Sequence, residues 1–203
     1  MKPSNPFADV SSASSRLPLV VGLALQSVVA YEWLNSAFTK IVHGGFAAGL
    51  ADELAKNSDS ASGWYWGVLE AVIIPHAAIF GYLIEAGELL VGAILVATAA
   101  LLFARGQHLS VGALRALLGV VALTALGGAF MNLNFSLFSG APAPWSLGSD
   151  TFSEGVGIDG ILMLMQLAMA GAAASLVYTL RDRGAVRAVA APGRGRPVAS
   201  RAA

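Results

Sequence analysis

The stretch from Ala77 to Ala104 constrains this chain more than any other. It is apolar apart from two carboxylates, Glu85 and Glu88. As a helix it would be about 42 Å long, which exceeds the roughly 30 Å hydrocarbon core of a bilayer. The two glutamates share one helix face with Gly81 and Gly92. Carboxylates inside a membrane are costly and mark functional sites. The stretch therefore predicts a membrane span with a polar stripe that a neighbouring helix can approach closely.

The composition extends this prediction to the whole chain. Of its 203 residues 56% are hydrophobic and only 12% are charged, whereas a soluble domain has about 25% charged residues. We therefore expect an all-α integral membrane protein, a four-transmembrane-helix bundle within residues 17–182. The polar residues 1–16 and the arginine-rich residues 183–203 are expected to be disordered. The four apolar runs place the spans at about 17–41, 77–104, 109–131 and 159–180.

A cleavable signal peptide is the alternative interpretation of the first apolar run. The run continues into Tyr31–Trp33 without a cleavage site made of small residues, which favours a membrane span.

An interfacial helical hairpin region is expected between the first two spans. Gly44 and Gly45 end the first helix. Phe46–Lys56 has the pattern of a short amphipathic helix on the membrane surface, and Trp64–Trp66 begins a second interfacial segment. Pro75 ends that segment, because the residue before a proline avoids the helical region.

The basic residues predict the orientation of the four spans. Only Lys40 and Lys56 of the twelve basic residues fall on one side, and the other ten fall on the opposite side. Because basic residues gather in the cytoplasm, we expect a multi-pass protein of a bacterial or archaeal cell membrane with both termini cytoplasmic. All four tryptophans map to the outer side, where an interfacial belt is expected; they are Trp33, Trp64, Trp66 and Trp145.

Three carboxylates are expected at similar depth in the outer half of the bundle. The helical rise puts Glu32 about 22 Å above the inner start of its span and Glu85 about 12 Å below the outer start of the next. Glu88 lies one turn deeper than Glu85. One buried carboxyl could simply form a hydrogen bond, but three at one depth indicate a site. Glu88, Glu85 and Glu32 are therefore the candidate catalytic residues, with Glu88 as the central proton carrier.

Polar side chains of other spans are expected to surround these carboxylates. Each has a structural alternative: an asparagine could cap a helix, a glutamine could form an interhelical hydrogen bond, and a lysine could anchor a helix end. The candidate ligand-binding residues are Lys40, Gly92, Asn132, Asn134 and Gln166.

Three motifs resemble the DoxX/DoxD family. E-W-L-N-S-A-F-T-K (Glu32–Lys40) resembles the end of that family's first helix, with Asn35 or Ser36 in place of the usual glycine. G-E-L-L-V-G (Gly87–Gly92) resembles its second-helix signature, a glutamate followed four residues later by a glycine. M-N-L-N-F-S-L-F-S-G (Met131–Gly140) resembles the end of its third helix. The resemblance covers roughly residues 17–182.

The resemblance implies a quinone-linked redox role in a membrane. DoxD is the small membrane subunit of thiosulfate:quinone oxidoreductase, whereas many DoxX relatives have no established reaction. A quinone cofactor and a second membrane or extracytoplasmic subunit are therefore expected. The family's motif residues correspond here to Lys40, Glu88, Gly92, Asn132 and Asn134.

The sequence also argues against several other classes of site. It has no cysteine, so it holds no disulfide, Fe–S cluster or thiolate metal site. No pair of histidines falls inside facing spans, so neither haem nor a metal is expected. It has no nucleotide-binding motif, and we expect no nucleic-acid partner. The alternative to an oxidoreductase subunit is a non-catalytic membrane module: an assembly factor, an anchor or a small-solute carrier.

Overall fold

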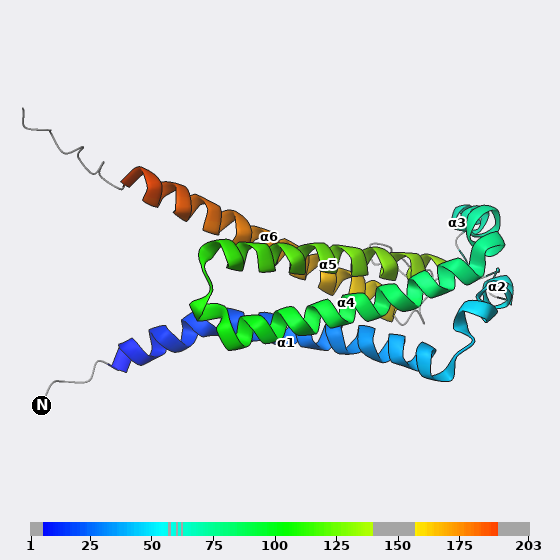
Figure 1. The fold of residues 1–203 in the computed structure, drawn as a ribbon, viewed down its shortest axis with the longest axis horizontal. Helices are drawn as coiled ribbons and strands as arrows, with labels where there is room; N and C mark the ends of the chain where they lie inside the picture. The colour runs from blue at the N-terminus through cyan, green and yellow to red at the C-terminus, as the bar shows by residue number, and fades with distance from the viewer. Residues whose placement is uncertain (1–5, 57, 60, 62, 140–156, 191–203) are drawn as a thin grey trace, which may run out of the picture.

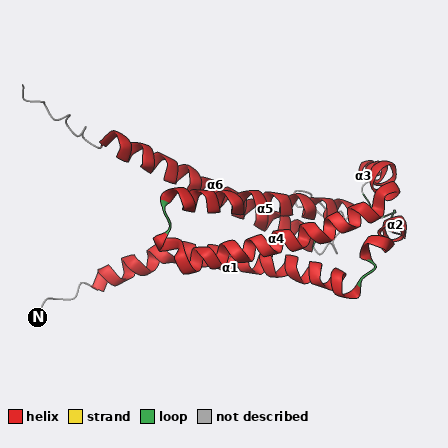
Figure 2. Cartoon of the chain, in the orientation of Figure 1, coloured by secondary structure: helices red, strands yellow, loops and turns green. Residues whose placement is uncertain are grey.

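The computed structural model describes residues 6–56, 58–59, 61, 63–139 and 157–190. These residues are helical almost throughout and contain no strand, so the expected all-α fold is confirmed for them (Figure 2). The elements in chain order are α1 (Pro6–His43), α2 (Phe46–Lys56), α3 (Gly63–Val68), the π-helical η1 (Leu69–Ile73), the 3₁₀ turn η2 (Ile74–His76), α4 (Ala77–Arg105), the 3₁₀ turn η3 (Gly106–His108), α5 (Val111–Ser139) and α6 (Ile158–Ala190).

Four long helices form an elongated bundle (Figure 1). α1 packs on α4, α4 on α5, α5 on α6, and α6 on α1. The start of α1, the end of α6 and η3 lie at one end of the bundle, and α2 and α3 lie at the other, which we call the α2–α3 end (Figure 1). The two described ends of the chain are therefore at the same end of the bundle, as expected for four long helices that run up and down.

Three helical segments are long and apolar enough to cross a membrane. Among the described residues they are Gly63–Arg105, Val111–Ser139 and Ile158–Arg181. This is consistent with a multi-pass membrane protein in a lipid bilayer. α1 does not belong to this set, and its described part carries Glu32 and Lys40 within its apolar sequence. The fourth span therefore stays a prediction.

Several helices extend beyond the spans expected from the sequence. α1 begins at Pro6, and α6 continues to Ala190 through an Ala- and Arg-rich segment that favours a helix. α5 continues to Ser139, because neither glycine nor proline follows Asn134 until residue 140. Asn132 therefore lies inside a helix and does not close it. The predictions for residues 1–5, 140–156 and 191–203 lie outside the described part of the chain.

The turn between α1 and α2 depends on two glycines. Gly44 and Gly45 have φ angles of 67° and 77°, in the left-handed region where a side chain is strained. The Gly44 N–H donates to the Lys40 carbonyl at 2.9 Å and closes the last turn of α1. α2 has the bounds expected from the sequence, and its buried residues are Ala47, Leu50 and Leu54.

The backbone stays helical from Gly63 to Arg105 but bends strongly on the way. α3 stands across the end of the bundle and α4 runs along it (Figure 1). Pro75 has no N–H to donate, and the bend contains η1 and η2, where the hydrogen-bond pattern departs from that of an α-helix. α4 begins at Ala77, where the sequence places the start of its second span.

Trp33 departs from the expected interfacial belt. Its side chain is only 4% exposed and belongs to the central core of the bundle. The prediction was wrong for Trp33, because it considered only depth, whereas Trp33 shares the inward face of α1 with Val29 and Ala30. Trp64, by contrast, is 69% exposed at the α2–α3 end. Trp145 lies outside the described residues.

The glycines of α4 allow close helix contacts, as the sequence predicts. A Cβ added at Gly92 would lie 2.7 Å from Cγ and 3.0 Å from the backbone nitrogen of Leu34 in α1. Gly81 lies in the same way against Ala47 of α2. The glycine-bearing face of α4 is therefore where α1 and α2 pack.

We expect Gly92→Leu to destabilise the bundle strongly. The new side chain would collide with the backbone of α1, and overpacking of this kind costs about 1–3 kcal/mol or more. The matched control is Ala93→Leu, because Ala93 is the adjacent residue and is exposed. Thermal unfolding in detergent measures both variants, and equal melting temperatures would contradict the close packing at Gly92.

Candidate functional site

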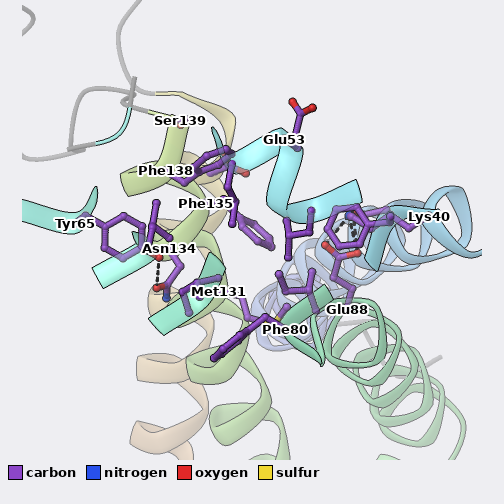
Figure 3. Close-up of a pocket in the computed structure, with 18 of the residues that line it drawn as sticks. Lys40, Glu53, Tyr65, Phe80, Glu88, Met131, Asn134, Phe135, Phe138 and Ser139 are labelled. Atoms are coloured by element: carbon purple, nitrogen blue, oxygen red, sulfur yellow. Dashed lines mark hydrogen bonds and ion pairs between the residues drawn. The ribbon is translucent and has the colours of Figure 1, made fainter. Parts of the chain in front are cut away.

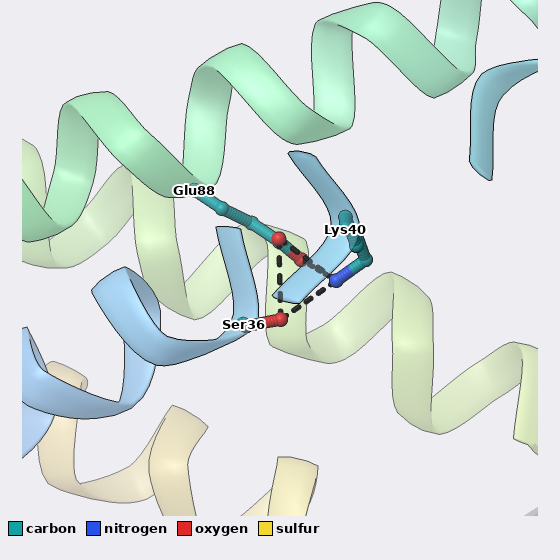
Figure 4. A network of polar contacts seen from close by, with 3 residues as sticks. All are labelled: Ser36, Lys40 and Glu88. Atoms are coloured by element: carbon teal, nitrogen blue, oxygen red, sulfur yellow. Dashed lines mark hydrogen bonds and ion pairs between the residues drawn. The ribbon is translucent and has the colours of Figure 1, made fainter. Parts of the chain in front are cut away.

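A buried ion pair joins α1 to α4 near the α2–α3 end (Figure 4). The Glu88 side chain is 0% exposed. Lys40 Nζ lies 2.7 Å from its Oε1 and 2.8 Å from its Oε2. Ser36 Oγ donates to Oε2 at 3.1 Å and accepts a hydrogen bond from Lys40 Nζ at 2.6 Å. Both carboxylate oxygens of Glu88 are therefore hydrogen-bonded.

The sequence of each helix explains how these three side chains meet. Ser36 and Lys40 are four residues apart, so they lie on one face of α1 one turn from each other. Glu88 is followed after four residues by Gly92, where α1 comes close to α4. Gly92 allows α1 and α4 to approach closely, and Glu88, one turn before it on α4, is the carboxylate that pairs with Lys40.

The ammonium group of Lys40 is fully engaged. An ammonium has three hydrogens, and Nζ has three acceptor oxygens within 2.8 Å: both oxygens of Glu88 and Oγ of Ser36. Nζ also lies 5.1 Å from the centre of the Phe46 ring, at cation–π distance. The pairing offsets part of the cost of removing the Glu88 charge from water, whereas the Lys40 side chain stays 21% exposed. The site is thus electrically balanced where the two helices meet.

A cavity of about 640 Å³ opens beside this ion pair (Figure 3). Its volume lies in the range of small-molecule binding sites. Aliphatic side chains and methionine fill the wall between the aromatic rings, and Glu53, Ser139 and Asp159 also line it. The lining rings are those of Phe46, Tyr65, Phe80, Phe130, Phe135 and Phe138.

A second polar group lies on another side of the cavity. Tyr65 donates its hydroxyl hydrogen to Oδ1 of Asn134 at 2.8 Å. Asn134 Nδ2 donates to the Phe130 carbonyl at 2.6 Å, which leaves one amide hydrogen. Figure 3 shows this pair on one side and Lys40 with Glu88 on the other, with Phe135 and Met131 between them. The cavity is therefore apolar in its middle and polar on two sides.

Of the residues predicted from the sequence, the structure brings Lys40, Glu88 and Asn134 to this cavity. Glu32 and Glu85 are half-buried, but neither lines the cavity. No hydrogen bond or ion pair joins them to Glu88 in the described part of the chain. Of the three expected carboxylates Glu88 alone lines the cavity, although Glu85 lies one turn away from it on the same face of α4.

Asn132 and Gln166 form an interhelical contact away from the cavity wall. Asn132 Nδ2 donates to Gln166 Oε1 at 2.8 Å, and the two residues are 2% and 0% exposed. Gly128 of α5 makes room for the glutamine. Gln166 Nε2 has no hydrogen-bond partner among the described residues. Gly92 likewise serves packing, so these three predicted ligand-binding residues lie outside the cavity lining.

Sequence reasoning missed Tyr65 and the aromatic lining. Tyr65 was interpreted as part of an interfacial segment, yet it is buried and points at Asn134. A signal was present in α5, where Phe130, Asn134 and Phe138 recur at every fourth position and share one face. That spacing indicates aromatic rings on both sides of a predicted site residue.

The fold and the site define an all-helical chain with three helices able to cross a membrane and an aromatic cavity beside a buried ion pair. Among the described residues no group of three or more His, Asp or Glu side chains could hold a metal ion. No protein family, curated protein or solved structure matches the chain. The resemblance to DoxX/DoxD proteins therefore stays a prediction.

Proposed function

We propose that this chain is a four-span membrane protein whose cavity binds a lipid-soluble quinone. In this proposal it is a DoxX/DoxD-like subunit of a quinone-linked oxidoreductase, of the thiosulfate:quinone type. The single observation that carries the proposal is the cavity itself, which has an aromatic middle and polar groups on two sides. The packing of α1 against α4 and α6 supports α1 as the fourth span.

The shape and chemistry of a quinone suit this cavity. A quinone has a flat ring that stacks on aromatic side chains, and two carbonyl oxygens that accept hydrogen bonds. The remaining amide hydrogen of Asn134 can donate to one carbonyl. Lys40 can donate to the other if it turns one N–H away from Ser36. Both ends of the ring would then be held.

Lys40 and Glu88 supply the proton chemistry of the proposal. Reduction of a quinone to a quinol consumes two electrons and two protons. In the ion pair the proton is on Lys40, so in this proposal the Lys40 ammonium gives the first proton to a carbonyl oxygen. Glu88, left without its charged partner, then takes up a proton from water and passes it to the other oxygen, and Lys40 is reprotonated from water afterwards. The electrons come from a partner subunit in this scheme. The electron donor of the proposed complex is thiosulfate, by resemblance alone.

One observation favours the non-catalytic membrane module instead. All three hydrogens of the Lys40 ammonium already have acceptors, and such a network can serve only to hold α1 against α4. An assembly factor, an anchor or a small-solute carrier needs this structural role of the ion pair and no proton transfer. Quinone binding and quinol formation separate the two candidates.

We further propose that both termini face the cytoplasm and that the α2–α3 end faces outward. Because the chain has no cysteine, single cysteines can be introduced cleanly. Asp59→Cys at the α2–α3 end should react with a membrane-impermeant maleimide in intact cells. Ser110→Cys, next to η3 at the opposite end, should react only after lysis. The reverse pattern would contradict the orientation.

Filling the cavity should block quinone binding. Ile84 lines the cavity, and Ile84→Trp would place an indole ring in the space available to the ligand. The neighbouring Leu83 is 60% exposed and does not line the cavity, so Leu83→Trp is the matched control. We expect Ile84→Trp to weaken the affinity for a short-chain ubiquinone at least tenfold in nanodiscs. Equal affinities of the two variants would place the quinone elsewhere.

A further inference from the structure

We infer that the cavity selects its ligand by charge, admitting neutral and cationic ring compounds and excluding anions. An anionic electron donor such as thiosulfate would then need a binding site in another chain. This inference rests on the proposed function in one respect: it takes the cavity as the ligand site.

The one cation that lines the cavity in the described part of the chain is already neutralised. Among the described residues Lys40 is the sole basic residue in the lining. Its three hydrogens are directed at Glu88 and Ser36, and the Phe46 ring covers it further. An entering anion would have to displace a fully buried carboxylate from its ion pair. Breaking such a pair leaves an uncompensated buried charge.

The other ionisable groups of the lining are acidic. Glu53 is on α2, where Lys56 lies 3.8 Å from its carboxylate and both side chains are well exposed. Asp159 is half-buried in the first turn of α6. With the Lys40–Glu88 and Lys56–Glu53 pairs both neutral, the net negative charge of the described lining rests on Asp159 in its ionised form. Like charges repel strongly where little water screens them.

The aromatic lining also disfavours anions. The faces of aromatic rings carry partial negative charge and attract cations. Six rings of the described residues line this cavity, and one of them, that of Phe46, lies at cation–π distance from the Lys40 ammonium. Rings and carboxylates together favour a ligand that is uncharged or positively charged, and a quinone is uncharged.

This selectivity places the chain within the proposed reaction. Another subunit would oxidise the anionic donor and pass the electrons to the quinone bound in this chain, which would handle only that lipid-soluble acceptor. The reaction that supplies it is therefore the oxidation of a donor bound in a separate water-accessible site.

A matched series of probes tests the inference. The probes are 2-naphthylmethanol, 2-naphthylmethyl-trimethylammonium and 2-naphthoate, with menadione as the quinone. Affinities are measured by titration calorimetry in nanodiscs of zwitterionic lipid, with empty nanodiscs subtracted. We expect 2-naphthoate to bind at least tenfold more weakly than the alcohol, and the ammonium to bind at least as tightly as the alcohol.

Two variants should strengthen the binding of 2-naphthoate. Asp159→Asn removes one lining carboxylate and should improve 2-naphthoate binding about three- to tenfold. Asp52→Asn, next to Glu53 on α2 but outside the lining, should leave it unchanged. Glu88→Gln frees Lys40, and 2-naphthoate should then bind more tightly than the alcohol. The Asp159 variant keeps the test decisive if the Glu88 variant folds poorly.

The outcomes separate the inference from the proposed function. Binding of 2-naphthoate as tight as that of the alcohol would overturn the charge selectivity, whatever menadione does. The expected order without menadione binding would support the selectivity and contradict the quinone proposal. Absence of binding by all four probes would overturn both. An equal gain in affinity for 2-naphthoate in Asp52→Asn and Asp159→Asn would also contradict the inference, because it would show an effect of overall surface charge.

Discussion

Replacing Lys40 with methionine is expected to lower the free energy of unfolding by about 3–5 kcal/mol. Lys40 is the only ion-pair partner of Glu88 among the described residues, and Glu88 has no exposed surface. The substitution therefore leaves a buried carboxylate with only Ser36 as a donor. Denaturant-induced unfolding in detergent, followed by circular dichroism, measures the loss.

A double variant and a surface control make this prediction specific. Adding Glu88→Leu to Lys40→Met removes the unpaired charge, so much of the lost stability should return. Lys56→Met removes the Lys56–Glu53 pair, whose side chains are 72% and 59% exposed, and should change stability by no more than about 1 kcal/mol. A Lys40→Met protein as stable as the original would show that the pair does not hold α1 against α4.

Glu88→Gln is expected to abolish quinone-linked turnover while the protein still inserts into the membrane. Glutamine keeps the size and hydrogen bonding of the side chain but cannot exchange a proton. The measurement is thiosulfate-dependent quinol formation in native membranes at matched protein level. Membrane insertion is checked separately, by the amount of each variant in the membrane fraction.

The other two candidate carboxylates provide the controls. Glu85→Gln and Glu32→Gln should each show a smaller loss than Glu88→Gln, because neither side chain lines the cavity. Full activity of Glu88→Gln would end the proton-carrier hypothesis and leave the non-catalytic membrane module as the better account. An equal loss in all three variants would indicate that the carboxylates act together, contrary to the geometry.

The helical parts of the fold were largely readable from the sequence. Long apolar runs predict the helices, Gly44 and Gly45 mark a helix end, and the register of Gly92 with Glu88 predicts a close contact. These features depend on local chemistry and on spacing along one helix. The ends of α1, α5 and α6 were less predictable, because apolar character ends before helical structure does.

The site was only partly predictable, because it depends on how helices rotate and bend. Depth along a helix can be calculated from the rise per residue, and it placed Glu88 and Asn134 in the outer half of the bundle with Lys40 at its rim. Depth gives no direction around a helix axis between different helices, so Glu32 was grouped with Glu88, and Gln166 with the ligand-binding residues. Tyr65 reaches the cavity through the bend between α3 and α4, which no spacing within one helix encodes.

The most direct test of the central claim is to locate a bound quinone on the chain. A photoreactive azidoquinone would be crosslinked to the purified protein in nanodiscs, and the labelled peptides mapped by mass spectrometry. We predict that labelling falls on the cavity wall, at Ile84 and Phe80 of α4 and at Met131 and Phe135 of α5. Excess unlabelled quinone should suppress it. Labelling confined to exposed positions outside the cavity such as Leu90 and Leu123, and not reduced by competitor, would contradict a quinone site beside the Lys40–Glu88 pair.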